Sequence, residues 1–335
     1  MKPLNKLLIV VLVCTILLMG CAPKEPETTP KTTPKPEATT PQASPEASPE
    51  TKLELPEKID KGGDSMITVY LIDEEKNKEM TVTEYLYGVV GGEAKKDWPE
   101  EVLKAQAIMA RTFLLEFMMN KKSQYEGADI STDVTEAQAY NAGNVNDAVK
   151  KAVDDTKGQV ITYDNKFIKA WFFSCSGGKT ATAPEGLDMK ENPPYIHSVP
   201  SDESAAPEDV QKWSKEFTKT KLDKALATME EDIGDYKTIE MGEKGDSGRC
   251  ITLKFGDAEV SCVHLRMALG ANEFRSTLLD EVKYENNVLK VSGKGFGHGV
   301  GVSQWGAYKK AEDGNKAKDI LMYYYKDVQI ANAWE

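Results

Sequence analysis

The sequence predicts a mixed α+β fold, because short β-hairpins and amphipathic helices follow one another in no steady strand–helix–strand order. An amphipathic helix is expected from Asp97 through Phe117, with Pro99 in its first turn and Glu100 completing a capping pair. The stretch from Cys250 to Cys262 predicts a hairpin that turns at Gly256-Asp257. About 280 residues follow the Pro-rich region, which is ample for a large core, and no second linker interrupts them.

The first twenty residues have the features of an export signal. A short basic start precedes an apolar run over residues 7–18, which is too short to span a bilayer comfortably but suits a signal peptide. The residues Leu18-Met19-Gly20-Cys21 resemble the lipobox of bacterial lipoproteins, in which the cysteine becomes the lipidated first residue; a plain secretory signal is the alternative. We therefore expect a signal peptide over residues 1–20 and a chain anchored through Cys21 to the outer face of the cytoplasmic membrane.

Residues 21–56 are expected to form a disordered tether. Nine of the sixteen prolines lie between residues 22 and 56, among Thr, Glu, Lys and Ser. Such a segment buries too little apolar surface to order itself, and proline favours extended conformations. At roughly 3 Å per residue the tether could hold a domain on the order of 100 Å from the membrane, which indicates a substrate inside a cell wall. The net charge of −12 argues against a nucleic-acid partner.

Glu93 follows a predicted short helix. Thr81 and Glu84 can form a capping box, and apolar residues at helical spacing follow them. Gly91 and Gly92 predict the end of this helix, which places Glu93 just beyond its terminus. A solvated loop carboxylate is the ordinary interpretation of such a residue. In a lined cleft, however, a glutamate can act as a general acid if burial raises its pKa towards about 6 or 7.

Five glycines alternate near the C-terminus, at positions 293, 295, 297, 299 and 301. In an extended chain this spacing removes the side chains from one face. Because glycine packs nothing and is costly in a strand, the pattern predicts that something large lies close against the bare backbone. A polymeric ligand would fit, since no lysine–serine pair or strand-to-helix setting for a phosphate accompanies the run.

Three motifs resemble those of a known family. The leading motif of the stage II sporulation protein D family, also called SpoIID/LytB, is similar to EYLYGVVGGEAKKDWPEEVLKAQAIMARTF, the run from Glu84 to Phe113. Further signatures of the family resemble SCSGGKT at residues 174–180 and GKGFGHGVGVSQWGA at residues 293–307. The resemblance implies one SpoIID-like catalytic domain over residues 65–332, whose hairpins and helices line a glycan-binding cleft.

The resemblance also implies a reaction. In the family, the glutamate that matches Glu93 is the catalytic residue of a lytic transglycosylase, a lyase acting on peptidoglycan glycan strands whose stem peptides an amidase has removed. It protonates the glycosidic oxygen and then, as a base, turns the 6-hydroxyl of the sugar onto the anomeric carbon, which leaves a 1,6-anhydro-muramic end. One carboxylate suffices, whereas ordinary glycosidases require two. A two-carboxylate hydrolase would need Glu84 or Asp97, whose capping roles already explain them.

The alternative from another class is a noncatalytic wall-binding protein that recruits or stimulates an N-acetylmuramoyl-L-alanine amidase. It would keep the same cleft and the same exported tether, so Glu93 alone does not exclude it. Lipidation in place of a spanning helix departs from the usual anchor of the sporulation protein. Sporulation, division and wall turnover therefore all stay open as the occasion of use.

Residues of the family motifs supply candidates for substrate binding. His298 and Gln304 lie in the last motif, where an imidazole or an amide can bind sugar hydroxyls; a conformational role is the alternative for His298. Arg111 on the long helix could bind substrate or form a buried salt bridge. The remaining candidates, some of which could simply make a tight turn, are Ser303, Ser176, Gly177, Gly178, Gly297 and Gly299.

Three cysteines besides the anchor remain after maturation, Cys175, Cys250 and Cys262. The predicted hairpin places Cys250 and Cys262 roughly opposite each other, so a disulfide can form outside the cytoplasm, and two reduced thiols are equally consistent with the sequence. Some family members carry a histidine before the S-x-S-G-G loop that can bind zinc with nearby cysteines, but Phe173 stands here. Scattered single His and Cys residues are usually structural, so we expect no metal and no other cofactor.

Overall fold

The computed structural model describes residues 53–60 and 64–334. The expected signal peptide, the expected lipidation site Cys21 and most of the expected tether lie outside these residues. Within the described chain, no helix is both long and apolar enough to cross a lipid bilayer.

Helices and strands are interspersed along the described residues, which confirms the α+β prediction. The helices are α1 (Val82–Glu93), α2 (Glu100–Asn120), α3 (Asp147–Asp155), α4 (Ala183–Leu187), α5 (Glu208–Gln211), α6 (Lys219–Thr228), α7 (Cys262–Leu269), α8 (Gln304–Glu312) and α9 (Ala317–Tyr324), with 3₁₀ turns η1 (Ile72–Glu74) and η2 (Ala142–Asn144). The strands are β1 (Met66–Leu71), β2 (Lys76–Thr81), β3 (Ile130–Ser131), β4 (Gln159–Tyr163), β5 (Lys166–Phe167), β6 (Phe172–Phe173), β7 (Lys212–Thr218), β8 (Ile239–Met241), β9 (Thr252–Phe255), β10 (Ala258–Ser261), β11 (Leu279–Glu285), β12 (Val288–Lys294), β13 (Val302–Ser303) and β14 (Gln329–Asn332).

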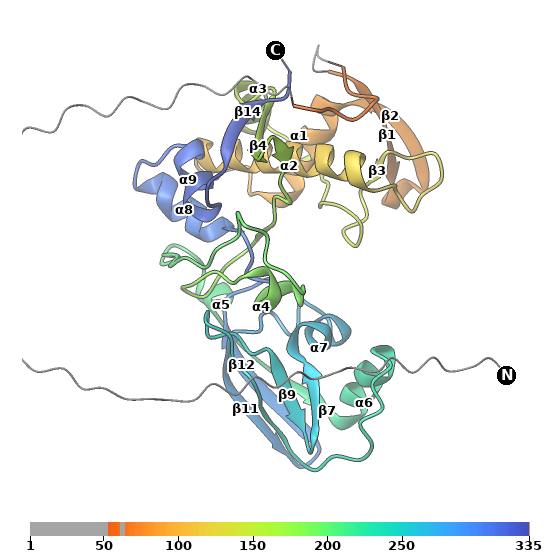
Figure 1. Cartoon of the computed structure of the whole chain (residues 1–335), viewed down its shortest axis with the longest axis vertical. Helices are drawn as coiled ribbons and strands as arrows, with labels where there is room; N and C mark the ends of the chain where they lie inside the picture. The colour runs from red at the N-terminus through yellow and green to blue at the C-terminus, as the bar shows by residue number, and fades with distance from the viewer. Residues whose placement is uncertain (1–52, 61–63, 335) are drawn as a thin grey trace, which may run out of the picture. The chain divides into compact units, whose positions relative to one another are not determined.

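The strands form several small sheets rather than one large one, with strand orders β2-β1-β3, β14-β4-β5, β11-β12-β7, β10-β9-β8 and β13-β6. Strand β14, from the end of the chain, pairs with β4, and Figure 1 shows the two side by side near α3. The short strands β6 and β13 pair in parallel, so residues 172–173 lie beside residues 302–303. This pairing brings together the loop at 174–180 and the glycine-rich motif, which are more than a hundred residues apart in sequence.

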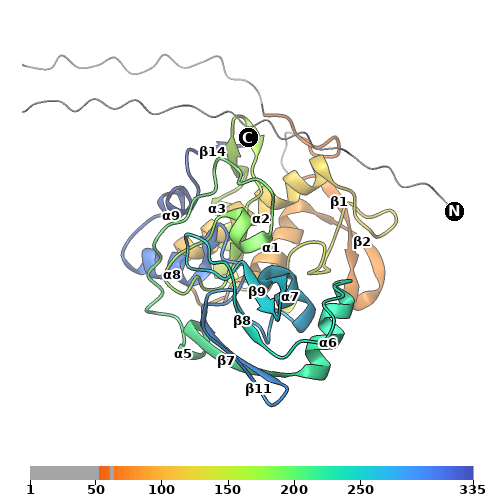
Figure 2. The same ribbon diagram turned by 60° about the horizontal axis from the view of Figure 1, so that its bottom comes forward.

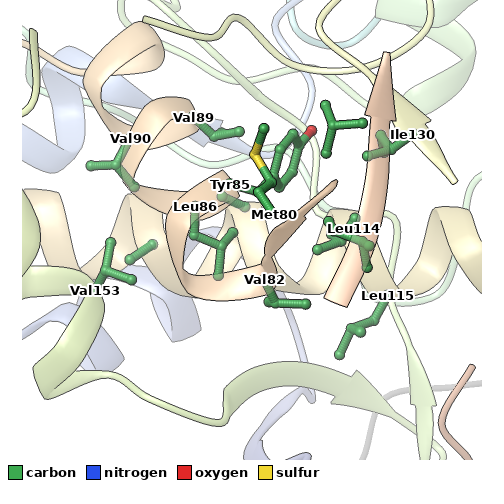
Figure 3. Packing of buried hydrophobic residues seen from close by; sticks show 14 of the residues in the cluster. Met80, Val82, Tyr85, Leu86, Val89, Val90, Leu114, Leu115, Ile130 and Val153 are labelled. Atoms are coloured by element: carbon green, nitrogen blue, oxygen red, sulfur yellow. The ribbon is translucent and has the colours of Figure 1, made fainter. Parts of the chain in front are cut away.

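Helix α2 is buried on two sides, which accounts for its length and apolar content. One side packs Leu103, Leu114 and Leu115 into a core shared with α1 and β1. Figure 3 shows Leu114 and Leu115 together with the residues of α1 in this core. The other side packs Val102, Ile108 and other residues against α8, α9 and β4. A third core, shared by β7, β9, β12, α6 and α7, lies within residues 213–291. Figure 2 shows β7, β9, α6 and α7 in the same part of the molecule.

Helix α1 begins as predicted but ends later. Its capping box is present, because Thr81 Oγ1 accepts from the Glu84 N–H while a Glu84 carboxyl oxygen accepts from the Thr81 N–H. The helix then continues through Gly91 and Gly92 to Glu93. A Cβ on Gly92 would lie 2.6 Å from the backbone of Ala139. The two glycines therefore allow another segment to pack closely on the helix, and they do not stop it.

Helix α2 begins at Glu100, three residues after the predicted start at Asp97. Residues 95–98 form a turn in which the Trp98 N–H donates to the Lys95 carbonyl at 3.0 Å. Pro99 is the N-cap residue and offers no side-chain cap. Asp97 is exposed and lies outside the helix, so the predicted capping pair with Glu100 does not form.

The alternating glycines do not form the extended, one-faced strand that their spacing predicted. Gly293 lies in β12, but the glycines at 295, 297, 299 and 301 all have positive φ, between 78° and 117°. They face the protein itself: a Cβ on Gly295 would lie 2.6 Å from the Cys175 carbonyl oxygen, and one on Gly297 would lie 2.6 Å from the Phe173 Cβ. Gly301 likewise lies against the Trp171 carbonyl oxygen and Gly299 against the Arg249 side chain. Other parts of the chain therefore require the bare backbone here, in place of the ligand inferred from the sequence.

The hairpin predicted between Cys250 and Cys262 is formed by β9 and β10, which are joined by Gly256 and Asp257. Cys262 is the first residue of α7, and its Sγ lies 2.7 Å from the Sγ of Cys250. Both are free thiols in this structure. Burial and the adjacent Cys250 thiol raise the pKa of Cys262.

The folded region begins before the predicted boundary at residue 65. Leu53 and Leu55 pack against the core around α1, and Ile59 is buried in it. Lys58 forms an ion pair with Asp129 at 2.8 Å. The last residues assigned to the tether therefore belong to the folded domain, because their apolar side chains cover this core.

Candidate active site

Glu93 lies in the wall of a pocket of about 370 Å³. The pocket also contains two more of the residues singled out in the sequence, His298 and Gln304. Among the described residues, Glu93 is the only carboxyl that lines it. The other lining residues come from α2, from the segment before η2 and from the segment around β6: Phe113, Ala137, Gln138, Ala170, Trp171, Phe172, Phe173 and Ser174.

The Glu93 carboxyl is suited to exchange a proton near neutral pH. Burial raises its pKa from 4.5 to about 7, while a 2.7 Å hydrogen bond from the Ala139 N–H to Oε1 opposes part of that rise. Among the described carboxyl groups whose pKa departs from its ordinary value, Glu93 is the only one whose pKa is raised. A group with a pKa near 7 populates both protonation states at neutral pH, as a general acid that later becomes a base requires.

The glycines before Glu93 explain how the Ala139 N–H reaches its carboxyl. Because Gly91 and Gly92 carry no side chain, the segment around Ala139 lies directly against the end of α1. The Asn144 side chain donates to the Gly91 carbonyl oxygen at 2.8 Å and ties the two together. The Gly-Gly-Glu sequence therefore positions the acid and the backbone group that holds it.

Gln304 supports Glu93 from the opposite motif. Its Nε2 donates to the Glu93 carbonyl oxygen at 3.0 Å and to Gln106 Oε1 at 3.1 Å. Gln304 is the first residue of α8, and Gln106 lies on α2. The amide thus joins three helices at the point where Glu93 leaves α1, and its Nε2 is occupied by the protein.

His298 lines the pocket, but its ring nitrogens are used within the protein. Nδ1 accepts from the Val300 N–H at 3.1 Å, so the proton is assigned to Nε2, which donates to the Phe172 carbonyl oxygen at 3.0 Å. Burial, together with the positive charges of Arg266 and Arg249, lowers the pKa of His298 to about 3. The imidazole is therefore neutral and holds the backbone of the pocket wall, in agreement with the conformational alternative.

Ser176, Gly178 and Ser303 point to a buried carboxylate that the sequence analysis missed. Glu203 is 6% exposed and accepts hydrogen bonds from the Ser176 N–H and hydroxyl, the Gly178 N–H and the Ser303 hydroxyl. Both serine side chains are fully buried. Their donors stabilise the loop at 174–180 against β13, and they are not available to a substrate. Glu203 has only a weak signal in the sequence, because it lies in a polar stretch typical of an exposed loop.

The other candidates for substrate binding do not line the pocket. Arg111 is buried and donates to the carbonyl oxygens of Gln159 and Val153, at 3.0 and 3.2 Å. The role of this guanidinium is to join α2 to α3 and β4, and not to form the salt bridge considered above. A Cβ on Gly177 would lie 2.8 Å from the Lys294 Cβ, and one on Gly299 would lie 2.5 Å from the Arg249 guanidinium.

Gln138 is a residue of the Glu93 pocket that the sequence analysis missed. It lines the pocket and is 3% exposed, and it directly precedes Ala139, whose N–H binds Glu93. Its signal in the sequence is weak, because a glutamine in a polar loop is ordinarily solvated.

In the part of the chain that the structure describes, no group of three or more His, Cys, Asp or Glu side chains could hold a metal ion. Cys175 lies 3.6 Å from Glu203, and burial together with that carboxylate raises the pKa of its thiol to about 12. The thiol is therefore protonated at neutral pH.

Fold and site together define an α+β protein in which one carboxyl, suited to exchange a proton near neutral pH, lines a pocket. Segments that are distant in sequence form the wall of this pocket. Family models match two parts of this chain. The family model described as "Stage II sporulation protein" matches residues 73–163, which include Glu93 and Gln138. A model for a domain of unknown function (DUF8618) matches residues 190–301.

Individual relatives extend the match over most of the chain. The stage II sporulation protein D of Bacillus amyloliquefaciens is 30% identical, over 80% of this chain and 79% of the relative. An uncharacterized protein of Brachyspira hyodysenteriae is 29% identical, over 76% of this chain and 67% of its own length. A Bacillus subtilis protein named amidase enhancer is 26% identical, over 74% of this chain and 40% of the relative. The chain belongs to the stage II sporulation protein D family.

Proposed function

We propose that this protein is a lytic transglycosylase that cleaves peptidoglycan glycan strands stripped of their stem peptides. Family membership and the amidase enhancer among its relatives support a role at the cell wall. The observation that carries the proposal is the state of Glu93, whose pKa lies at about 7 in a pocket where it is the only carboxyl among the described lining residues. An ordinary glycosidase would need a second carboxylate across the scissile bond.

Glu93 acts first as the acid. Its protonated carboxyl gives the proton to the glycosidic oxygen as positive charge develops at the anomeric carbon, and the bond to the leaving sugar breaks. The carboxylate that results is stabilised by the Ala139 N–H. It then takes the proton of the sugar's 6-hydroxyl while that oxygen bonds to the anomeric carbon. The product carries a 1,6-anhydro-muramic end, and Glu93 regains its proton without a second carboxylate.

The test uses the full chain, purified in detergent, with peptide-stripped glycan strands. Mass spectrometry should detect 1,6-anhydro-muramic products, and Glu93→Gln should abolish them without loss of fold. Glu84→Gln is the matched control on the same helix, because a capping box accepts glutamine as well as glutamate and Glu84 is exposed at the other end of α1. Ordinary reducing ends would indicate hydrolysis, and no product at all would exclude the enzyme.

The second candidate is a noncatalytic enhancer or recruiter of a cell-wall amidase, which the resemblance to the amidase enhancer favours. Activity without an amidase separates the two. If the purified chain binds glycan strands and accelerates an added amidase but releases no fragment alone, this candidate replaces the transglycosylase.

We also propose that the chain acts from the outer face of the cytoplasmic membrane, anchored by lipid at Cys21. The lipobox-like residues 18–21 and the Pro-rich residues 22–56 support this location. Cys21→Ala should move the protein from the membrane fraction to the medium or the soluble fraction. If the variant stays in the membrane fraction, another anchor holds the chain.

A further inference from the structure

Gln138 is a buried amide that no described residue satisfies. Its side chain is 3% exposed, and neither Oε1 nor Nε2 has a hydrogen-bond partner within the described chain. Other buried polar side chains also lack a partner for at least one atom there, but Gln138 is the only one of them that lines the Glu93 pocket. An unpaired buried carboxamide costs free energy. Its place in the pocket wall suits it to bind a polar group that enters the pocket.

The position of Gln138 relative to Glu93 narrows what that group is. Ala139, the next residue, donates its N–H to Glu93 Oε1 at 2.7 Å. Consecutive Cα atoms are only about 3.8 Å apart. Because Ala139 contacts the Glu93 carboxyl directly, the Cα of Gln138 lies no further from that carboxyl than about the width of one sugar ring. Glu93 acts at the oxygen on C1 of the sugar. On the ring that carries C1, the substituent next to that carbon is the one on C2, which is therefore among the groups within reach of Gln138.

We propose that Gln138 recognises the 2-acetamido group of the sugar on which Glu93 acts. This inference rests on the proposed function, because it places a glycan in the Glu93 pocket. The Nε2 of Gln138 donates to the acetamido carbonyl oxygen, and Oε1 accepts from a polar hydrogen of the same strand. Phe113 and Ala170 line the same pocket and offer apolar contact to the acetyl methyl group. A plain hydroxyl on C2 extends less far from the ring than the acetamido carbonyl, so a glucose ring should leave the amide unpaired.

The test measures binding, so that it does not depend on cleavage. The full chain carrying Glu93→Gln is titrated by calorimetry with β-1,4-linked tetramers of N-acetylglucosamine and of glucose, which are both uncharged and differ at C2. The N-acetylated tetramer should bind about tenfold or more tightly than the glucose tetramer. Adding Gln138→Met should weaken binding of the N-acetylated tetramer about tenfold and leave the glucose tetramer unchanged. Gln329→Met, at an exposed glutamine on β14, is the matched control and should change neither.

Three results would overturn the proposal. In the first, the Glu93→Gln chain binds both tetramers equally. In the second, it does not bind the N-acetylated tetramer. In the third, Gln138→Met weakens the binding of both tetramers equally, as a merely structural role would. Thermal unfolding checks the fold of each variant. If Gln138→Met does not fold, Gln138→Asn replaces it, because it keeps the amide but shortens its reach and should also lose the preference.

The outcome is separable from that of the proposed function. If binding of the N-acetylated tetramer depends on Gln138 while the wild-type chain releases no 1,6-anhydro product, the assignment of Gln138 stands and the transglycosylase does not. If the products form and Gln138→Met changes neither binding nor the preference, the reverse holds.

Discussion

Replacing Glu93 by glutamine should remove a loss of stability that wild type suffers as the pH rises towards 7, and the size of the effect follows from the structure. Burial raises the pKa of this carboxyl from 4.5 to about 7. Each unit of difference in pKa corresponds to about 1.4 kcal/mol, so ionising Glu93 in the folded protein costs about 3 kcal/mol relative to the unfolded chain. Glutamine has a similar shape, cannot ionise and can still accept the Ala139 N–H, so it removes the cost and keeps the contact.

The sign follows from which state binds the proton more tightly. Between pH 4.5 and about 7 the folded protein keeps the Glu93 proton while the unfolded chain has released it, so the free energy of unfolding falls as pH rises. The stability that the Glu93 proton contributes to the folded protein is fully present below pH 4.5 and is lost as the pH rises through about 7. The stability of Glu93→Gln, relative to wild type, should therefore increase by about 3 kcal/mol between pH 4 and pH 8.

Urea unfolding of the full chain, followed by tryptophan fluorescence at pH values from 4 to 8, measures this difference. Other titrating groups are common to both proteins and cancel in the comparison. Glu84→Gln, on the same helix, should follow the wild-type profile because Glu93 is intact. Parallel curves for wild type and Glu93→Gln would refute the reasoning, because they would show that the carboxyl is not perturbed by burial. The assignment of Glu93 as an acid near neutral pH would then lose its basis.

Three further predictions concern the frame of the site. Gln304→Leu removes two hydrogen bonds, so it should lower the free energy of unfolding, measured in urea, by about 1–3 kcal/mol. It should also lower the turnover number more than it changes KM, and an unchanged turnover number would contradict a role in positioning Glu93. Glu203→Ala should lower the free energy of unfolding by about 3 kcal/mol or more, because it leaves several buried donors without an acceptor. A thermal midpoint equal to that of wild type would contradict this. Gly297→Ala should cost about 3 kcal/mol or more from a clash and a positive φ, whereas Gly256→Ala, with positive φ but no described atom within 4 Å, should cost about 1 kcal/mol; equal losses would show that the contact with Phe173 is unimportant.

Some local patterns in the sequence predicted local structure correctly, although the capping pair of Asp97 with Glu100 did not form. The capping box at Thr81 and the turn of the hairpin at Gly256 are set by interactions between residues a few positions apart, and both are present. The glycines were interpreted less well, because glycine marks several different constraints. Gly92 was interpreted as a helix stop, but it is the place where Ala139 packs closely on the helix. The alternate glycines near Gly297 were interpreted as a strand, but they are positive-φ residues that pack on other parts of the chain. Both constraints depend on segments distant in sequence.

The sequence by itself determined the α+β class, the family and the choice of Glu93 as the candidate acid, because these rest on local periodicity and on motifs that are continuous in the chain. Only the tertiary structure decided what surrounds Glu93. The raised pKa, the N–H of Ala139, the support from Gln304 and the unpaired amide of Gln138 all arise from burial between segments that the chain folds together. Desolvation and long-range hydrogen bonds have no signature in a linear pattern. For that reason the sequence did not reveal that Ser176 and Gly178, two of the substrate candidates in the loop at 174–180, donate hydrogen bonds to the buried Glu203.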